Sequence, residues 1–95
     1  MKEYELLLNI MNAIGEKWAL AILILIFLNS QTNFTFLKKT LKLTSRTLSR
    51  KLSLLSSIGI IKKETFGRRN KAIYTLTDMG KKLCSHLVQL KSLIG

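Results

Sequence analysis

The chain has 95 residues, of which 47% are hydrophobic, so it can form one hydrophobic core but not a second domain. Its formal net charge of +11 at pH 7 favours a polyanionic partner, either nucleic acid or an anionic membrane surface. The single cysteine, Cys84, excludes an intramolecular disulfide and a CxxC metal or redox motif, and it fits a reducing, cytoplasmic setting.

The positive charge is concentrated in the middle third of the chain. Residues 38–71 contain eleven basic side chains and a single acid, Glu64, which gives this segment a net charge of +10. The remaining segments carry five bases and four acids. We therefore expect the partner-binding surface to lie within residues 38–71.

The first two predicted helices are largely apolar. Apolar residues recur at helical spacing over residues 2–14, and Gly15 marks the end of this helix. A second helix is expected from about residue 16 to residue 28; it is apolar almost all round, which predicts a buried core helix containing Trp18. Its uncharged run is about half the roughly 20 residues that a membrane-spanning helix needs. The polar residues 29–33 are expected to be a connection.

Two short helices then follow each other closely. Thr35 is expected to be the N-cap of the third helix, and either Thr44 or Ser45 the N-cap of a fourth helix that reaches about residue 57. Gly59 supplies the left-handed end of the fourth helix. Two such helices, separated by a turn of three or four residues, form the helix-turn-helix pattern.

A β-hairpin and a last helix complete the predicted fold. Residues 60–65 and 72–76 are rich in β-branched and aromatic residues, and residues 66–71 between them have the composition of a turn. Thr77 is expected to cap the last helix, whose apolar seam comprises Met79, Leu83, Leu87, Leu90 and Ile94. The predicted fold class is mainly α with a small β-hairpin wing, a winged helix-turn-helix in which four helices precede two strands and a final helix. It forms one domain over residues 1–95.

The fourth helix has two distinct faces. Its leucines, Leu48, Leu52 and Leu55, cluster on one side at helical spacing. The opposite side carries two arginines and three serines and no acid: Arg46, Ser49, Arg50, Ser53 and Ser57. A helix that enters the major groove of DNA needs short polar residues for close approach and long donors such as Arg, which can pair with guanine. The alternative, a solvated face, would normally contain Glu as well as Lys.

The predicted hairpin carries Arg68 and Arg69 beside Gly67. An arginine at such a tip suits insertion into a narrow minor groove, although a solubilising turn would have the same composition. Lysines flanking the helix and the hairpin, including Lys63, are expected near phosphates. The expected DNA-binding residues are Ser45, Arg46, Ser49, Arg50, Ser53, Arg68, Arg69, Lys38, Lys39, Lys42, Lys62 and Lys71.

Five segments, in the same order, resemble the HxlR family of winged-helix regulators, a relative of the MarR group. They are Ile14-Gly15-Glu16-Lys17-Trp18, which resembles IGGKW; Phe34-Thr35-Phe36-Leu37, which resembles RFxEL; the recognition helix over residues 45–52; Ser57-Ile58-Gly59-Ile60-Ile61, which resembles DGLV; and Tyr74-Thr75-Leu76-Thr77-Asp78-Met79-Gly80, which resembles YxLTxxG. The resemblance covers about residues 10–90. It implies a DNA-binding transcriptional regulator and a homodimer formed by the terminal helices. The apolar side chains within residues 2–14 and 77–94 are consistent with that dimer.

The chain departs from the family pattern in two places. It has no cysteine before the first helix, and its hairpin is shorter and has no proline. The cysteine-based redox or aldehyde sensing known in some members therefore does not carry over.

Other classes of function fit the sequence less well. With one histidine and one aspartate there is no Ser-His-Asp set, so no enzyme and no cofactor is expected. Cys84 and His86 point about 200° apart on a helix, so they predict a buried thiol and a surface imidazole and no metal site. Two alternatives remain: a non-specific or architectural nucleic-acid-binding protein, and a basic protein-interaction or membrane-surface module.

Overall fold

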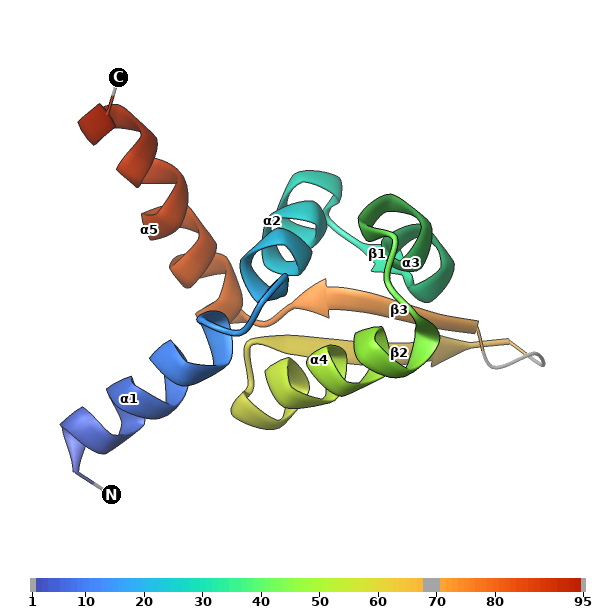
Figure 1. The fold of residues 1–95 in the computed structure, drawn as a ribbon, viewed down its shortest axis with the longest axis horizontal. Coiled ribbons are helices and arrows are strands. Elements are labelled where there is room, and N and C mark those ends of the chain that lie inside the picture. The colour runs from blue at the N-terminus through green and yellow to red at the C-terminus, as the bar shows by residue number, and fades with distance from the viewer. Residues whose placement is uncertain (1, 68–70, 95) are drawn as a thin grey trace.

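The computed structural model describes residues 2–67 and 71–94. The helices are α1 (Glu3–Ile14), α2 (Ala19–Asn29), α3 (Phe34–Leu41), α4 (Ser45–Ile58) and α5 (Asp78–Ile94), and the strands are β1 (Thr32–Asn33), β2 (Ile61–Phe66) and β3 (Lys71–Leu76). The predicted fold class is confirmed: a mainly helical chain with a small antiparallel sheet, in which the β2–β3 hairpin extends beyond α4 as a wing (Figure 1).

The sheet has one more strand than the sequence predicted. Its order is β1-β3-β2, with both pairings antiparallel. Thr32 and Asn33 pair with Tyr74 and Ile73 of β3, although the sequence predicted only a polar connection there. The two residues of β1 carry no recognisable strand pattern of their own, because their pairing depends on a strand about forty positions further along the chain.

The ends of α3 and α4 are fixed by local hydrogen bonds. The N-cap of α3 is Asn33, whose side-chain oxygen accepts a hydrogen bond from the backbone N–H of Phe36 at 2.8 Å; the prediction of Thr35 was wrong. At α4 the prediction is confirmed: the Thr44 hydroxyl oxygen accepts from the Thr47 N–H, and Gly59 ends the helix with a left-handed φ of 86°. Residues 42–44 therefore form the turn of the helix-turn-helix.

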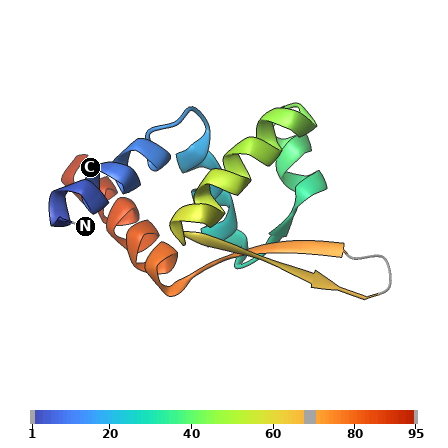
Figure 2. The same cartoon turned by 90° about the horizontal axis from the view of Figure 1, so that it is seen from below.

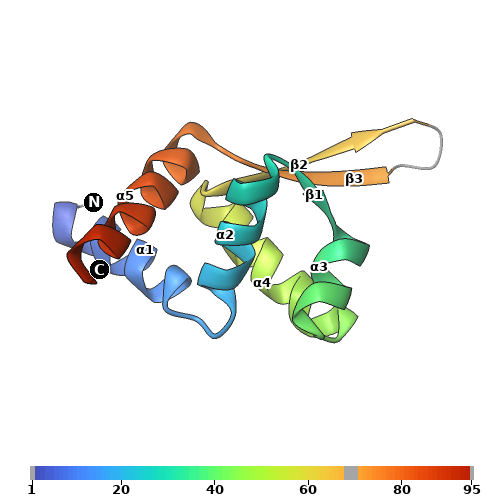
Figure 3. The ribbon, with the colours of Figure 1, turned by 90° about the horizontal axis from the view of Figure 1, so that it is seen from above.

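The core lies on one side of the sheet, where α2, α3 and α4 pack (Figure 3). Leu48, Leu52 and Leu55 of α4 are buried there, as their spacing predicted. They meet apolar residues from α2, α3, the sheet and α5: Ile22, Leu23, Ile26, Leu37, Ile60, Ile61, Tyr74, Leu76 and Cys84. This packing holds the opposite face of α4 toward solvent.

The helix α2 begins later than predicted, and this changes the role of Trp18. We expected a helix from about residue 16 with Trp18 buried in it. Instead Trp18 precedes α2 in a left-handed conformation with a φ of 72°, and 41% of its surface is exposed. The Lys17 ammonium lies 5.7 Å from the centre of its ring. The prediction of a buried tryptophan was wrong, because residues 15–18 form a turn whose conformation composition alone does not reveal.

The two terminal helices extend from the same end of the molecule in diverging directions (Figures 1 and 2). Only Ala13 of α1 is buried, and α1 packs against α4. The helix α5 is anchored through Cys84, whose sulfur lies 3.8 Å from the Leu23 carbonyl oxygen. Large apolar side chains of both helices remain exposed, among them Tyr4, Leu7, Leu8, Met11, Val88, Leu90 and Leu93.

Within residues 2–67 and 71–94, no single helix combines the length and hydropathy needed to cross a membrane. The pair α1 and α2 reaches that length only together, and the chain bends by 85° between them.

Candidate nucleic-acid interface

The exposed face of α4 is the centre of the candidate site. Arg46, Ser49, Arg50, Ser53 and Ser57 are all exposed, and the buried leucines occupy the opposite face. The predicted division of this helix into two faces is therefore confirmed. Seen from below, α4 lies in front of α2 and α3 with the hairpin beside it (Figure 2), and α4 also packs against β2. The face of α4 that carries these residues is thus open to a partner.

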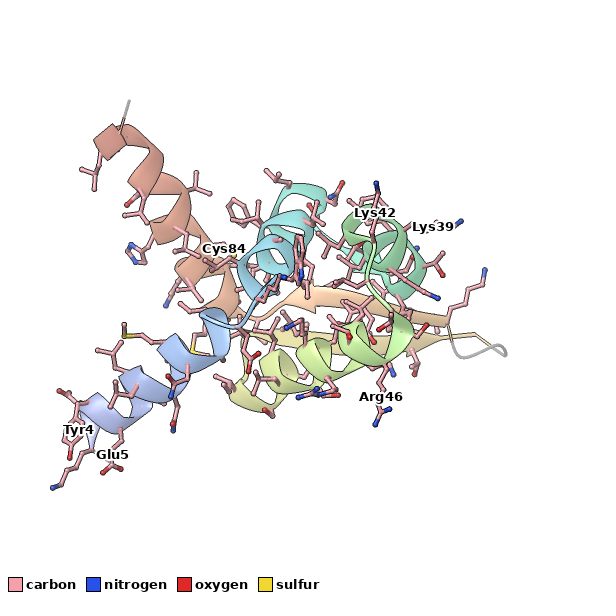
Figure 4. All side chains as sticks on the ribbon, in the orientation of Figure 1. Tyr4, Glu5, Lys39, Lys42, Arg46 and Cys84 are labelled. Atoms are coloured by element: carbon pink, nitrogen blue, oxygen red, sulfur yellow. The ribbon has the colours of Figure 1, made fainter. Side chains whose placement is uncertain are left out.

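The first turn of α4 is built to face an anion. Thr44 and Thr47 tie the turn together, since the Thr44 hydroxyl group donates to the Thr47 oxygen at 2.9 Å and accepts from its N–H at 3.2 Å. This turn contains no acid, and Arg46 projects from it away from the protein (Figure 4). The positive end of the helix dipole and the guanidinium group therefore act in the same direction.

A groove of about 490 Å³ runs between α4 and the hairpin. Its helix wall consists mainly of serine hydroxyl groups, and Lys63 of β2 and Tyr74 of β3 complete it. The Ser57 hydroxyl group is already used, because it donates to the Leu54 carbonyl oxygen at 2.7 Å. Ser49 and Ser53 remain as the exposed hydroxyl groups nearest the middle of the helix. Burial raises the pKa of the Tyr74 phenol.

The structure separates two neighbouring lysines that the sequence treated alike. Side chains alternate between the two faces of a strand, and Ile61 points into the core. Lys63, two residues later, lies on the α4 side and lines the groove. Lys62 lies on the other side of the strand, where its ammonium group is 3.5 Å from the Glu64 carboxylate. Lys63 is therefore the better placed of the two to contact a ligand of α4, and the period-two pattern after Ile61 was the signal that could have shown it.

Arg50 has an acidic neighbour that sequence reasoning missed. A depression beside α4 is lined by Glu16, Thr47, Arg50, Lys51 and Leu54. The carboxylate of Glu16 lies 3.7 Å from the ammonium of Lys51, whose side chain is only 13% exposed. This ion pair links the turn before α2 to the middle of α4. Of the two neighbouring cations Arg50 and Lys51, Arg50 is therefore the one that faces outward.

The lysines of α3 form a second basic surface. Lys38, Lys39 and Lys42 are exposed, and together with Ser45 and Thr35 they line a depression of about 480 Å³. Figure 4 shows Lys39 and Lys42 projecting from α3 on the side opposite to Arg46. The expected residues therefore do not all face one way: Arg46 lies on one side of the helix-turn-helix, and Lys39 and Lys42 lie on the other.

The tip of the wing lies outside the described residues. Arg68 and Arg69, both expected to bind DNA, belong to this segment. At its two ends, Phe66 and Lys71 pair across the hairpin and both are exposed.

The cysteine and the histidine occupy the environments predicted for them. Cys84 is fully buried, and burial raises the pKa of its thiol. His86 is exposed. In the part of the chain that the structure describes, no three His, Cys, Asp or Glu side chains come together in a way that could hold a metal ion.

A winged helix-turn-helix with an acid-free, arginine-bearing face on its second motif helix is typical of one class of protein, the winged-helix transcriptional regulators. The chain belongs to the HxlR-like helix-turn-helix family, whose model matches residues 13–95. The resemblance noted from the sequence is thereby confirmed.

Solved structures agree with this assignment. A transcriptional regulator homologue from Pyrococcus horikoshii OT3 is 26% identical with a TM-score of 0.76, over 95% of this chain and 94% of that one. A protein described as a MarR-family transcriptional regulator from Enterococcus faecalis V583 is 25% identical with a TM-score of 0.82, over 98% and 84%. HlyU from Vibrio cholerae N16961, 21% identical with a TM-score of 0.79 over 95% and 97%, shares the fold. No curated protein sequence matches the chain.

Proposed function

We propose that this protein is a sequence-specific, double-stranded-DNA-binding transcriptional regulator that acts as a homodimer. The observation that carries the proposal is the exposed face of α4, where two arginines and the Ser49 and Ser53 hydroxyl groups project from a helix whose other face is buried in the core. Placed in the major groove, this face supplies bidentate donors for guanine and short side chains that permit close approach.

The remaining cations are assigned by their position around α4. Lys63 faces the same groove as Ser49 and Ser53, so we assign it to the phosphate backbone next to the recognition helix. Arg68 and Arg69, which lie outside the described residues, are assigned from the sequence to the backbone and the minor groove. Lys38, Lys39, Lys42, Lys62 and Lys71 project from other sides and are assigned a weaker, long-range attraction to the duplex. Ser45, in the first turn of α4, is uncharged and is assigned a hydrogen bond to a phosphate.

The homodimer is supported by the terminal helices. A small domain rarely leaves a contiguous set of large apolar side chains in water without a partner for them. Leu7, Leu8 and Met11 of α1 and Leu90 and Leu93 of α5 are each at least half exposed, and the two helices extend from one end of the molecule. A second copy that covers them would place two recognition helices on one duplex, with half-sites about one helical turn apart.

Selection of bound sequences from a random pool of duplexes tests the proposal. We expect a two-fold symmetric site. On that site Arg50→Ala should lose about 1 to 3 kcal/mol of binding free energy, and it should lose little on a scrambled duplex, because Arg50 contacts base edges. Lys82→Ala is the matched control, since Lys82 is an exposed cation on α5.

Two outcomes would contradict sequence-specific recognition. The pool could yield no common sequence, or Arg50→Ala and Lys82→Ala could lose the same small affinity on both duplexes. Either result would favour the alternative of a non-specific, architectural nucleic-acid-binding protein.

A further inference from the structure

The depression beside α4 brings one acid and two cations of the described residues together: Glu16, Arg50 and Lys51. Glu16 belongs to the turn between α1 and α2, and its carboxylate lies 3.7 Å from the Lys51 ammonium group. The sequence has no acid between residues 17 and 63, so α2, α3 and α4 offer Lys51 no acidic partner of their own. The charge of Lys51 is therefore balanced from a segment that lies outside the helix-turn-helix.

Local contacts hold Glu16 in this place. Its backbone N–H donates to the Ala13 carbonyl oxygen at 3.3 Å, and its carbonyl oxygen accepts from the Ala19 N–H at 3.0 Å. Lys17, the neighbouring cation of the turn, is directed at another group, since its ammonium lies 5.7 Å from the centre of the Trp18 ring. The Glu16 carboxylate is thus presented to α4 by a turn whose backbone is fixed on both sides.

The ion pair contributes little to the stability of the fold. The Glu16 side chain is 51% exposed, and solvent screens an ion pair with one partner in water. The pair has a larger effect on the position of the Lys51 ammonium group. The Lys51 side chain is only 13% exposed, although it follows Arg50 directly and has a flexible stem that can carry its charge outward.

We propose that Glu16 is a positioning residue for DNA recognition: it holds the Lys51 ammonium group away from DNA phosphates and thereby raises the sequence specificity of α4. A phosphate contact adds affinity for every duplex and carries no sequence information. With Lys51 held back, Arg50 is the cation in the middle of α4 that meets the duplex, and its contacts to base edges distinguish sequences. This inference rests on the proposed function.

The release of Lys51 favours wrong sequences. On the selected site, the base contacts of Arg50 fix the register of α4, so a released ammonium group is not free to move to the nearest phosphate. On a scrambled duplex no base contact fixes that register, and α4 settles where the ammonium group reaches the backbone. Glu16 therefore acts against non-specific binding, because it lowers the affinity for the wrong partner more than for the right one.

The test measures the affinity of Glu16→Gln for the selected and scrambled duplexes by fluorescence anisotropy over a series of salt concentrations. Glutamine has nearly the shape of glutamate and keeps the backbone hydrogen bonds of the turn, so thermal unfolding should be almost unchanged. We expect about fivefold tighter binding to the scrambled duplex and at most about twofold tighter binding to the selected one. The slope of log affinity against log salt on the scrambled duplex should steepen by about one unit, which a purely structural role would not produce.

Two further variants locate the effect. Glu16→Gln combined with Lys51→Gln should bind both duplexes like Lys51→Gln alone, because the acid acts through that lysine. Glu64→Gln is the matched control, since it removes the same charge and releases Lys62 on the side of β2 away from the groove. It should change the affinity for both duplexes by the same small factor.

An unchanged ratio of the two affinities in Glu16→Gln would overturn the inference, and so would an effect that persists in the Lys51→Gln background. A ratio that falls as much in Glu64→Gln would attribute the effect to net charge and overturn it as well. Failure of the proposed function looks different. If selection yields no common sequence, sequence-specific recognition fails, whereas the salt slopes of the wild type and Glu16→Gln on random DNA still decide whether Glu16 restrains Lys51.

Discussion

The backbone of Gly80 lies directly against the carbonyl group of Ile60, so that a β-carbon at position 80 would overlap the Ile60 oxygen. Thr77 closes the same junction. Its hydroxyl group lies 2.5 Å from the Gly59 carbonyl oxygen and 3.1 Å from that of Ile60, and its oxygen accepts from the Gly80 N–H at 3.1 Å. The residues Leu76-Thr77-Asp78-Met79-Gly80 therefore join the end of α4 to the start of α5, which explains physically why Thr and Gly stand three positions apart.

Gly80→Ala should strongly destabilise the fold. The new methyl group would push α5 away from the Ile60 carbonyl group and weaken the hydrogen bonds of Thr77, at a cost of about 2 to 4 kcal/mol in the free energy of unfolding. Urea denaturation followed by circular dichroism measures this. Ser85→Ala, at an exposed position of α5, is the control and should change stability by less than about 0.5 kcal/mol. Equal stability of the two variants would show that the junction is looser than its geometry implies.

Trp18→Ala should lower the free energy of unfolding only slightly, because the residue is 41% exposed. We expect a loss of about 1 to 2 kcal/mol in the free energy of unfolding, below the 3 to 5 kcal/mol typical of a buried tryptophan. Trp18→Gly should be at least as stable as Trp18→Ala, since a glycine adopts the φ of 72° without steric cost. Chemical denaturation of the two variants gives the comparison. A loss above about 3 kcal/mol for alanine would mean that the tryptophan is covered in solution, for example by a second copy.

The proposed dimer predicts a mass of about twice 10.8 kDa by light scattering at micromolar concentration. Leu8→Glu and Leu90→Glu should each shift the protein to a monomer, because a carboxylate buried in an apolar interface is expensive to desolvate. Leu28→Glu is the matched control: Leu28 is 70% exposed but lies on α2, outside the terminal helices, so this variant should stay dimeric. A monomeric wild type, or a monomeric Leu28→Glu variant, would contradict the assigned interface.

Arg68 and Arg69 should contribute to DNA affinity without contributing to sequence specificity. Arg68→Ala with Arg69→Ala should weaken the selected and scrambled duplexes to a similar degree and lower the slope of log affinity against log salt by about one to two units. Fluorescence anisotropy over a series of salt concentrations measures the slope, with Lys81→Ala and Lys82→Ala on α5 as the control of equal charge. A loss confined to the selected duplex would instead assign base contacts to the wing.

The sequence by itself determined the features that depend on neighbours within a few positions. The leucines of α4 separate from its arginines and serines because helical spacing puts them on opposite faces. Thr44 and Gly59 mark the ends of this helix because capping and left-handed backbone are local properties, and Gly67 marks the hairpin turn for the same reason. The order of these elements indicated a winged helix-turn-helix, and the five segments that resemble HxlR motifs indicated the family.

The tertiary structure decided whatever depends on residues far apart in the chain. Thr32 is in a strand because β3 lies beside it, and Asn33, which follows it, caps α3 in place of Thr35. Lys62 and Lys63 differ because only one faces α4. Lys39 and Lys42 point away from Arg46 because the core fixes the angle between the two helices. Charge counted along a sequence says how strongly a chain attracts a polyanion; which cations share one surface is set by the packing of elements that the local pattern does not contain.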